Sequence, residues 1–160
     1  KPQEYSAWSF LIGLGWIALG ILFLGIMALF VGTPSQIRVL TMMWLPIIGA
    51  GGFAQLFEGA LSYLMPVVIG GGPSVVRIGI AILDWQFALR VALRNGALLL
   101  QVALFWAATS TAVTTLRYAL WLVVIMTFAI DIVLFARAGK DQARARRERI
   151  KEMSESRKAQ

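Results

Sequence analysis

The chain has 160 residues, of which 59% are hydrophobic and 14% charged, and its formal net charge is +7. Soluble domains are nearer to about 45–50% apolar and about 25% charged, so the composition places this chain among membrane proteins. The sequence contains neither Cys nor His. This excludes thiolate catalysis, disulfides, histidine acid–base catalysis, and metal or haem sites that use those side chains.

Four apolar runs have the length of roughly 20 residues that a membrane-spanning helix needs. They are expected at 7–31, 39–69, 91–113 and 116–136. As a straight helix the second run would measure about 46 Å, which exceeds the apolar thickness of a bilayer. We therefore expect it to tilt, kink or protrude, with Pro46 and Pro66 as the kink sites.

Three glycines and Pro73 break the chain after the second run, and a short apolar segment, Ser74–Leu83, follows. Because this segment carries Arg77, we expect it to lie at the membrane interface. The third and fourth runs are joined by a short turn, which predicts antiparallel neighbours. The predicted fold is all-α: a polytopic domain over 1–136 with four transmembrane helices and a short interfacial segment, followed by a basic tail over 137–160.

Basic residues are distributed unevenly over the two sides of this topology. Nine of the fifteen lie in the tail, and Lys1, Arg77, Arg90 and Arg94 would share its side of the membrane. The opposite side would hold only Arg38 and Arg117. Since basic residues favour the cytoplasmic side, we expect a multi-pass protein of a bacterial inner membrane with both termini in the cytoplasm.

Glu58 lies in the middle of the second apolar run, and Gln55 and Ser62 share its helix face. A charge at the bilayer centre costs at least about 2.5–3.5 kcal/mol. Gln101, near the middle of the third run, could complete an intramembrane polar site. Such a site either responds to protons or ions, or contacts a quinone or a lipid head group. Alternatively, it fixes helix packing by hydrogen bonding, which we prefer because a lone acid is a poor proton relay.

Asp131 lies in the last turns of the fourth run, and we expect it to form an interfacial ion pair with Arg90, Arg94 or Arg137. The tail is predicted to be a solvated helix against anionic lipid head groups. The residues assigned to that contact are Arg144, Arg146, Arg147, Arg149 and Lys151. Binding to a partner subunit is the alternative. Nucleic acid is not expected, because a basic tail after a spanning helix usually reflects topology.

The block Gln55–Pro73, together with Arg77 and Arg90–Gly96, resembles the membrane region of actinobacterial copper-oxidase-like proteins. In those proteins a polytopic segment precedes extracytoplasmic cupredoxin domains of the nitrite-reductase or multicopper-oxidase type. The resemblance implies a membrane module associated with a respiratory or copper redox system. Copper ligation of that type uses His and Cys, which this sequence lacks, so no copper site is carried over.

The sequence thus favours a non-catalytic membrane module or accessory subunit that anchors or assembles a bacterial respiratory or copper redox complex. It would bind no cofactor alone, with lipid or quinone as the ligands considered, and its partners would be membrane lipids and other membrane subunits. The alternative is a small proton- or ion-coupled transporter or channel subunit that uses Glu58.

Overall fold

The computed structural model describes residues 4–30, 33–107 and 110–158, and within these ranges the chain is helical with short turns and no strand. The all-α prediction is therefore confirmed. Lys1 and Val31, which entered the charge count and the first predicted span, lie outside the described residues, as does Thr109 in the third predicted span.

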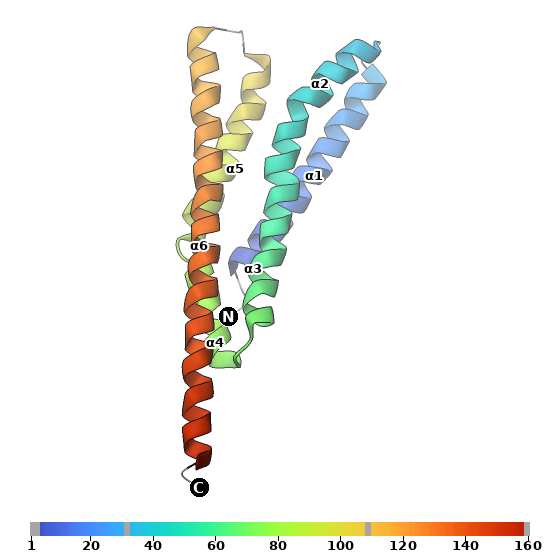
Figure 1. Ribbon diagram of the computed structural model, residues 1–160. Helices are drawn as coiled ribbons and strands as arrows, with labels where there is room; N and C mark the ends of the chain where they lie inside the picture. Colours follow the sequence, from blue (N-terminus) through green and yellow to red (C-terminus); the bar gives the residue numbers. More distant parts are fainter. Residues whose placement is uncertain (1–3, 31–32, 108–109, 159–160) are drawn as a thin grey trace.

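Four helical stretches are long and apolar enough to cross a membrane, as the sequence predicts. Figure 1 labels the helices in chain order: α1 (Glu4–Phe30), α2 (Pro34–Ile47), α3 (Gln55–Ile69), α4 (Pro73–Leu83), α5 (Phe87–Ala103) and α6 (Thr111–Lys158). A π-helical segment, Ile48–Ala54, joins α2 to α3 without a break, and a short 3₁₀ turn, Leu104–Trp106, ends the α5 stretch.

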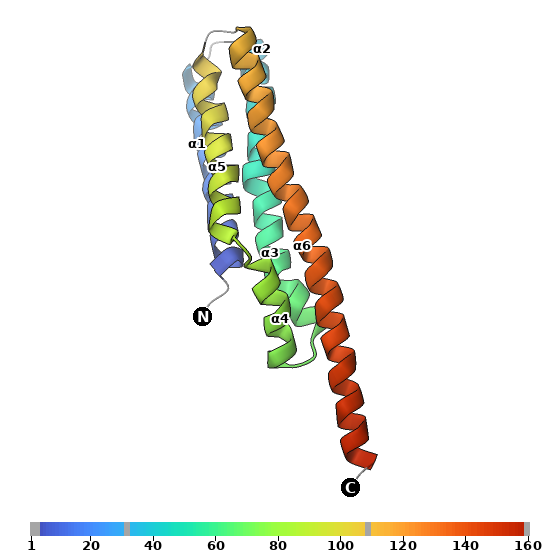
Figure 2. The ribbon, with the colours of Figure 1, turned by 90° about the vertical axis from the view of Figure 1, so that its left-hand side faces the viewer.

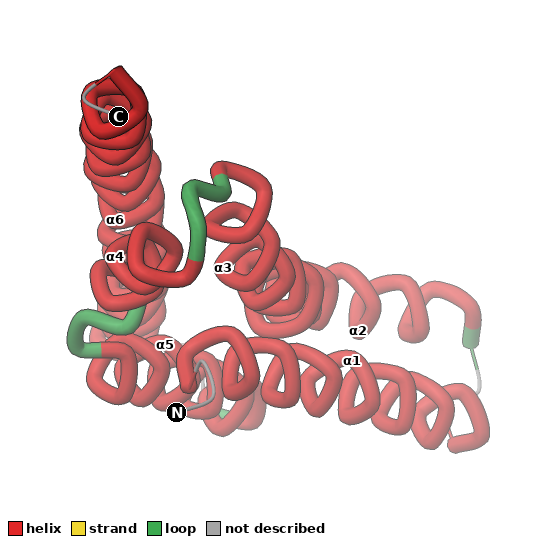
Figure 3. Tube along the Cα trace, turned by 90° about the horizontal axis from the view of Figure 1, so that it is seen from below, coloured by secondary structure: helices red, strands yellow, loops and turns green. Residues whose placement is uncertain are grey.

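The helices form two hairpins. In the first, α1 packs against the continuous path from α2 through α3, and in the second, α6 packs against α4 and α5. The hairpins meet at the end of the bundle that carries α4, and they lean apart toward the opposite end (Figure 1). The view along the bundle shows the same divergence of α1 and α2 from α5 and α6 (Figure 3). The helix axes thus lie close together at one end and diverge at the other, the splayed end, where ring contacts such as Trp44–Phe105 still join the hairpins.

Local sequence explains the irregular second span. Pro46 lies inside α2 and cannot donate a backbone hydrogen bond, and the π-helical segment follows directly. Glycines in that segment let α1 come close: a Cβ on Gly51 would lie 2.8 Å from the Trp16 ring. Small residues permit close helix crossings in membrane proteins. This crossing holds the first hairpin together.

The turn between α3 and α4 consists of Gly70, Gly71 and Gly72, all with positive φ (68°, 100° and 88°), which glycine adopts without steric cost. Pro73 then starts α4 at a helix position that suits its fixed φ. The short segment predicted from the sequence is therefore a helix, and it packs along α3 and α6. Gln86, with a left-handed φ of 46°, separates α4 from α5.

The main apolar core lies between the hairpins, where α1 and α2 face α5 and α6. It contains Trp16, Trp44, Ile47, Ala97, Leu98, Leu120 and Val124. Most large apolar side chains on the helix surfaces are exposed, including those at the end of α1, where Leu29 and Phe30 are about four-fifths exposed. Exposed apolar surface on this scale is what a lipid environment covers. The helix α6 then continues past the other helices (Figure 2).

Candidate functional site

A buried cluster of four charged side chains joins the two hairpins: Glu58 from α3, Arg90 and Arg94 from α5, and Asp131 from α6. Arg94 is central, and its side chain is fully buried. Its Nη1 donates to Glu58 Oε2 at 2.5 Å, while its Nη2 donates to Asp131. Arg90 pairs with the other carboxylate oxygen of Asp131. We call these four residues the charge cluster.

Neutral side chains form further hydrogen bonds and ring contacts with the residues of the charge cluster. Arg94 Nε donates to Thr127 Oγ1 at 3.1 Å, and its guanidinium lies 3.8 Å from the centre of the Phe128 ring. The hydroxyl of Tyr5, in the first turn of α1, donates to Glu58 Oε2 at 3.1 Å. The two positive charges of the arginines balance the two negative charges of the carboxylates, so the charge cluster is neutral overall. Such a cluster tolerates burial, whereas loss of one member would leave an uncompensated charge.

Arg90 also fixes the junction between α4 and α5. Its Nε donates to the carbonyl oxygen of Trp85 at 3.0 Å, and its Nη2 donates to that of Leu83 at 2.5 Å. Carbonyl groups at the end of a helix lack intrahelical donors, so a guanidinium placed there satisfies them. The charge cluster therefore joins α3, α5 and α6 directly, and it reaches α1 through Tyr5 and the end of α4 through Arg90.

Helix periodicity brings these side chains together. Arg90 and Arg94 are four residues apart on α5, and Thr127 and Asp131 are four apart on α6, so each pair lies on one helix face. Contact with Tyr5 places Glu58 level with the beginning of α1, whose apolar length is about 39 Å. Glu58 thus lies toward one end of that length, although it is central in its own apolar run.

A second polar layer lies next to the charge cluster. Gln55 Nε2 donates to Asn95 Oδ1 at 2.9 Å, and Asn95 Nδ2 donates to Gln55 Oε1 at 3.1 Å. Trp16 Nε1 also donates to Asn95 Oδ1, at 2.7 Å. This reciprocal amide pair links α3 to α5 and includes α1. The charge cluster and the neutral groups bonded to it or next to it form the polar joint between the hairpins. Its neutral members are Tyr5, Trp16, Gln55, Asn95 and Thr127.

Three residues proposed for the polar sites lie elsewhere or play smaller parts. Ser62 is buried, and its hydroxyl donates to the carbonyl oxygen of Glu58 within α3. Gln101 is about two turns beyond Arg94 on α5, roughly 10 Å away, and donates to the carbonyl oxygen of Arg117 at 2.7 Å. Gln101 therefore does not join Glu58.

Arg137 does not pair with Asp131. The two residues are six positions apart on α6 and so lie on different faces of the helix. Arg137 instead approaches Asp141 at 3.7 Å, and its side chain is 71% exposed. This exposed pair contributes little to stability, so the ion pairs that matter for packing are those of the charge cluster.

The basic part of α6 is held against the α3–α4 turn. Gln142 is fully buried, and its Nε2 donates to the carbonyl oxygens of Pro66 (2.6 Å) and Gly70 (3.2 Å). Arg146 Nη1 donates to the carbonyl oxygen of Ile69 at 2.9 Å, and Arg149 Nη1 donates to that of Gly71 at 2.8 Å. We call Gln142, Arg146 and Arg149 the α6 clamp.

The five residues assigned to lipid head groups are therefore used differently. Arg146 and Arg149 contact the chain's own turn, whereas Arg144 forms an exposed pair with Glu148 at 3.1 Å. Arg147 and Lys151 are exposed on the outer surface of α6. Four of the five residues are exposed and Arg149 is half-buried, so the predicted head-group surface is largely open, although two of its arginines also bind the α3–α4 turn.

Sequence reasoning missed four contributors to the polar joint: Tyr5, Trp16, Asn95 and Thr127. The spacing of Thr127 to Asp131 on one helix face was the available signal for Thr127. Tyr5 and Trp16 gave no such signal, because aromatic residues at the end of a span are expected at the membrane interface.

Among the described residues, no group of three or more Asp or Glu side chains is arranged to hold a metal ion. The polar groups of the joint form ion pairs and amide hydrogen bonds with one another. Comparison with known proteins gave no relative: no family model, no curated protein and no solved structure matches this chain.

Proposed function

We propose that this chain is a non-catalytic integral membrane subunit that anchors a larger complex and holds a basic helical arm in a fixed direction. The observation that carries the proposal is the single 48-residue helix α6, which contains both Asp131 of the charge cluster and the α6 clamp. One rigid element thus connects the apolar bundle to the basic arm.

The geometry suits positioning because α6 is fixed at two levels. Asp131 binds two guanidinium groups inside the bundle, and Gln142 binds the α3–α4 turn about three turns further on. The part of α6 from Arg137 to Lys158 would reach about 33 Å as a helix. Its exposed cations, including Arg147 and Lys151, are available to anionic lipid or to an acidic partner surface.

In this proposal the arm lies in the cytoplasm of a bacterial cell, because its basic residues would favour that side of the inner membrane. The resemblance of Gln55–Pro73, Arg77 and Arg90–Gly96 to the membrane region of copper-oxidase-like proteins suggests a respiratory or copper redox complex as the partner. The electron carriers would then belong to other subunits.

Purification in mild detergent through an N-terminal tag, with mass spectrometry and an optical spectrum, tests the proposal. We expect membrane polypeptides to co-purify in stoichiometric amounts. A variant with Arg144, Arg147 and Lys151 changed to Ser should lose them, and an Arg38→Gln control on α2 should retain them. A chain that purifies alone, or equal recovery of partners by both variants, contradicts the anchoring function.

A coupled transporter is the second candidate, and one observation favours it: beyond the charged contacts and the apolar core, the hairpins diverge and leave a cavity between them. Two units that rock about such a joint could alternate access. This function requires that the Glu58→Gln molecules that still fold after reconstitution into proteoliposomes lose proton-coupled flux. Equal flux from wild type and variant excludes it.

A further inference from the structure

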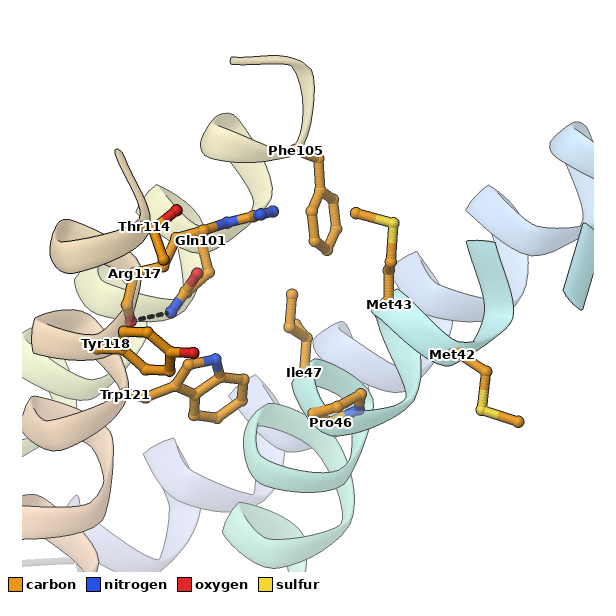
Figure 4. Close-up of a pocket in the computed structure, with 10 residues that line it drawn as sticks. All are labelled: Met42, Met43, Pro46, Ile47, Gln101, Phe105, Thr114, Arg117, Tyr118 and Trp121. Atoms are coloured by element: carbon orange, nitrogen blue, oxygen red, sulfur yellow. Dashed lines mark hydrogen bonds between the residues drawn. The ribbon is translucent and has the colours of Figure 1, made fainter. Parts of the chain in front are cut away.

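A cavity of about 310 Å³ lies between the hairpins at the splayed end of the bundle. Its walls differ: α2 contributes apolar side chains, including Met43 and Ile47, whereas α5, the 3₁₀ turn after it and α6 contribute polar and aromatic ones (Figure 4). The second wall is made by Gln101, Phe105, Thr114, Arg117, Tyr118 and Trp121. A cavity with one apolar wall and one polar wall fits an amphiphile.

Arg117 gives the cavity its charge. Its guanidinium extends toward Phe105 and lies 5.6 Å from the centre of that ring (Figure 4). None of the ion pairs formed among the described residues includes Arg117. This distinguishes it from Arg90 and Arg94, whose charges are matched by carboxylates. A guanidinium facing a cavity without an acid is suited to a phosphate oxygen.

Neighbouring groups also favour an anion here. Thr114 lies in the first turn of α6, where the helix dipole is positive, and its hydroxyl can donate. The hydroxyl of Tyr118 is a further donor on the same wall. Gln101 is held by its bond to the carbonyl oxygen of Arg117, which fixes α5 against α6 below the cavity.

We propose that this cavity binds the phosphate group of an anionic membrane phospholipid. Its volume is at the lower limit of small-molecule sites, which start at about 300 Å³, so it accommodates a head group and leaves the acyl chains outside. The chains would lie along the apolar side of α2, where Met42 and Leu45 are exposed. The site is independent of the anchoring function and of the arm, which is at the other end of the bundle.

Native mass spectrometry of the full chain in detergent, incubated with defined lipids, tests the site. The probes are dioleoyl phosphatidylglycerol, dioleoylglycerol with the same chains and no phosphate, inorganic phosphate, and a prenylated naphthoquinone. We expect retention of phosphatidylglycerol alone. Arg117→Gln should weaken binding by about tenfold or more, as the loss of a charge-assisted hydrogen bond implies.

Two further variants keep the test decisive. Arg38→Gln removes a cation of α2 that does not line the cavity, and this variant should bind as the wild type does. Met43→Trp fills the cavity without changing charge and should abolish binding, even if Arg117→Gln fails to fold. Equal retention of dioleoylglycerol, displacement by inorganic phosphate, selective retention of the quinone, or unchanged binding by Met43→Trp overturns the proposal.

Discussion

Arg94 Nη1 donates to Glu58 Oε2 at 2.5 Å, and this ion pair ties α5 to α3 across the boundary between the two hairpins. The same guanidinium also binds Asp131 on α6. One buried arginine therefore connects three helices, and the charge balance around it has measurable consequences.

Loss of the Glu58 charge should destabilise the bundle. Glu58→Gln leaves two guanidinium groups with only one carboxylate, and breaking a buried pair typically costs about 3–5 kcal/mol. The measurement is unfolding of the purified chain in detergent. The double variant Glu58→Leu, Arg94→Met restores neutrality and should recover most of the loss. A double variant as unstable as the sum of its two single variants would contradict this account.

Asp131 should matter far more than the exposed acid ten residues further along α6. Asp131→Asn removes the partner of two buried arginines, and we expect a loss at the upper end of about 3–5 kcal/mol. Asp141→Asn breaks only the exposed pair with Arg137 and should change stability by less than about 1 kcal/mol. Similar unfolding midpoints for the two variants would show that burial does not set the effect.

The crossing of α1 and α3 depends on Gly59. A Cβ there would lie 2.9 Å from the backbone nitrogen of Phe10 and from the backbone oxygen of Ser6, so Gly59→Ala must push α1 away. We expect destabilisation of about 1–3 kcal/mol, as overpacking usually gives. Gly15→Ala is the control, because nothing lies within 4 Å of its Cβ position. Unfolding of both variants in detergent measures the difference.

The α6 clamp should restrain the α3–α4 turn. Gln142→Ala removes two hydrogen bonds to carbonyl oxygens at the end of α3, and we expect faster hydrogen–deuterium exchange over 70–76 and at the start of the basic arm. Exchange near the charge cluster should not change. Arg144→Ala, which breaks an exposed pair on α6, is the control. Unchanged exchange in Gln142→Ala would mean that the arm is not held by this residue.

The helices themselves could be predicted from the sequence. Apolar length identifies the four spanning stretches, and three glycines before Pro73 mark the break between α3 and α4. The straight continuation of α6 could be seen only in part, because the change from apolar to basic residues at Arg137 suggested a boundary. The helix continues across that change, because this part of α6 contains no Pro and its one Gly, Gly139, is itself helical.

The charge cluster was harder to predict, because the sequence of one helix does not determine how deep each of its residues lies relative to the other helices. Glu58 is central in its own run, which suggested an isolated acid, but the second span has 36 residues and is longer than a bilayer core, so the middle of the run need not be the middle of the membrane. The level of Glu58 relative to Tyr5 and Arg94 depends on how the hairpins pack. Gln101 lies beside Arg117 and not beside Gln55 because of the register between the packed helices, which the sequence of one helix does not show.

The most direct test of the account is co-purification of partner polypeptides with the neutral double variant Glu58→Leu, Arg94→Met. If the charge cluster only holds the hairpins of an anchoring subunit together, the folded double variant should retain its partner polypeptides at wild-type stoichiometry. Loss of the partners from a variant whose unfolding midpoint matches that of the wild type would contradict it, because Glu58 or Arg94 would then act in the complex beyond holding the hairpins together.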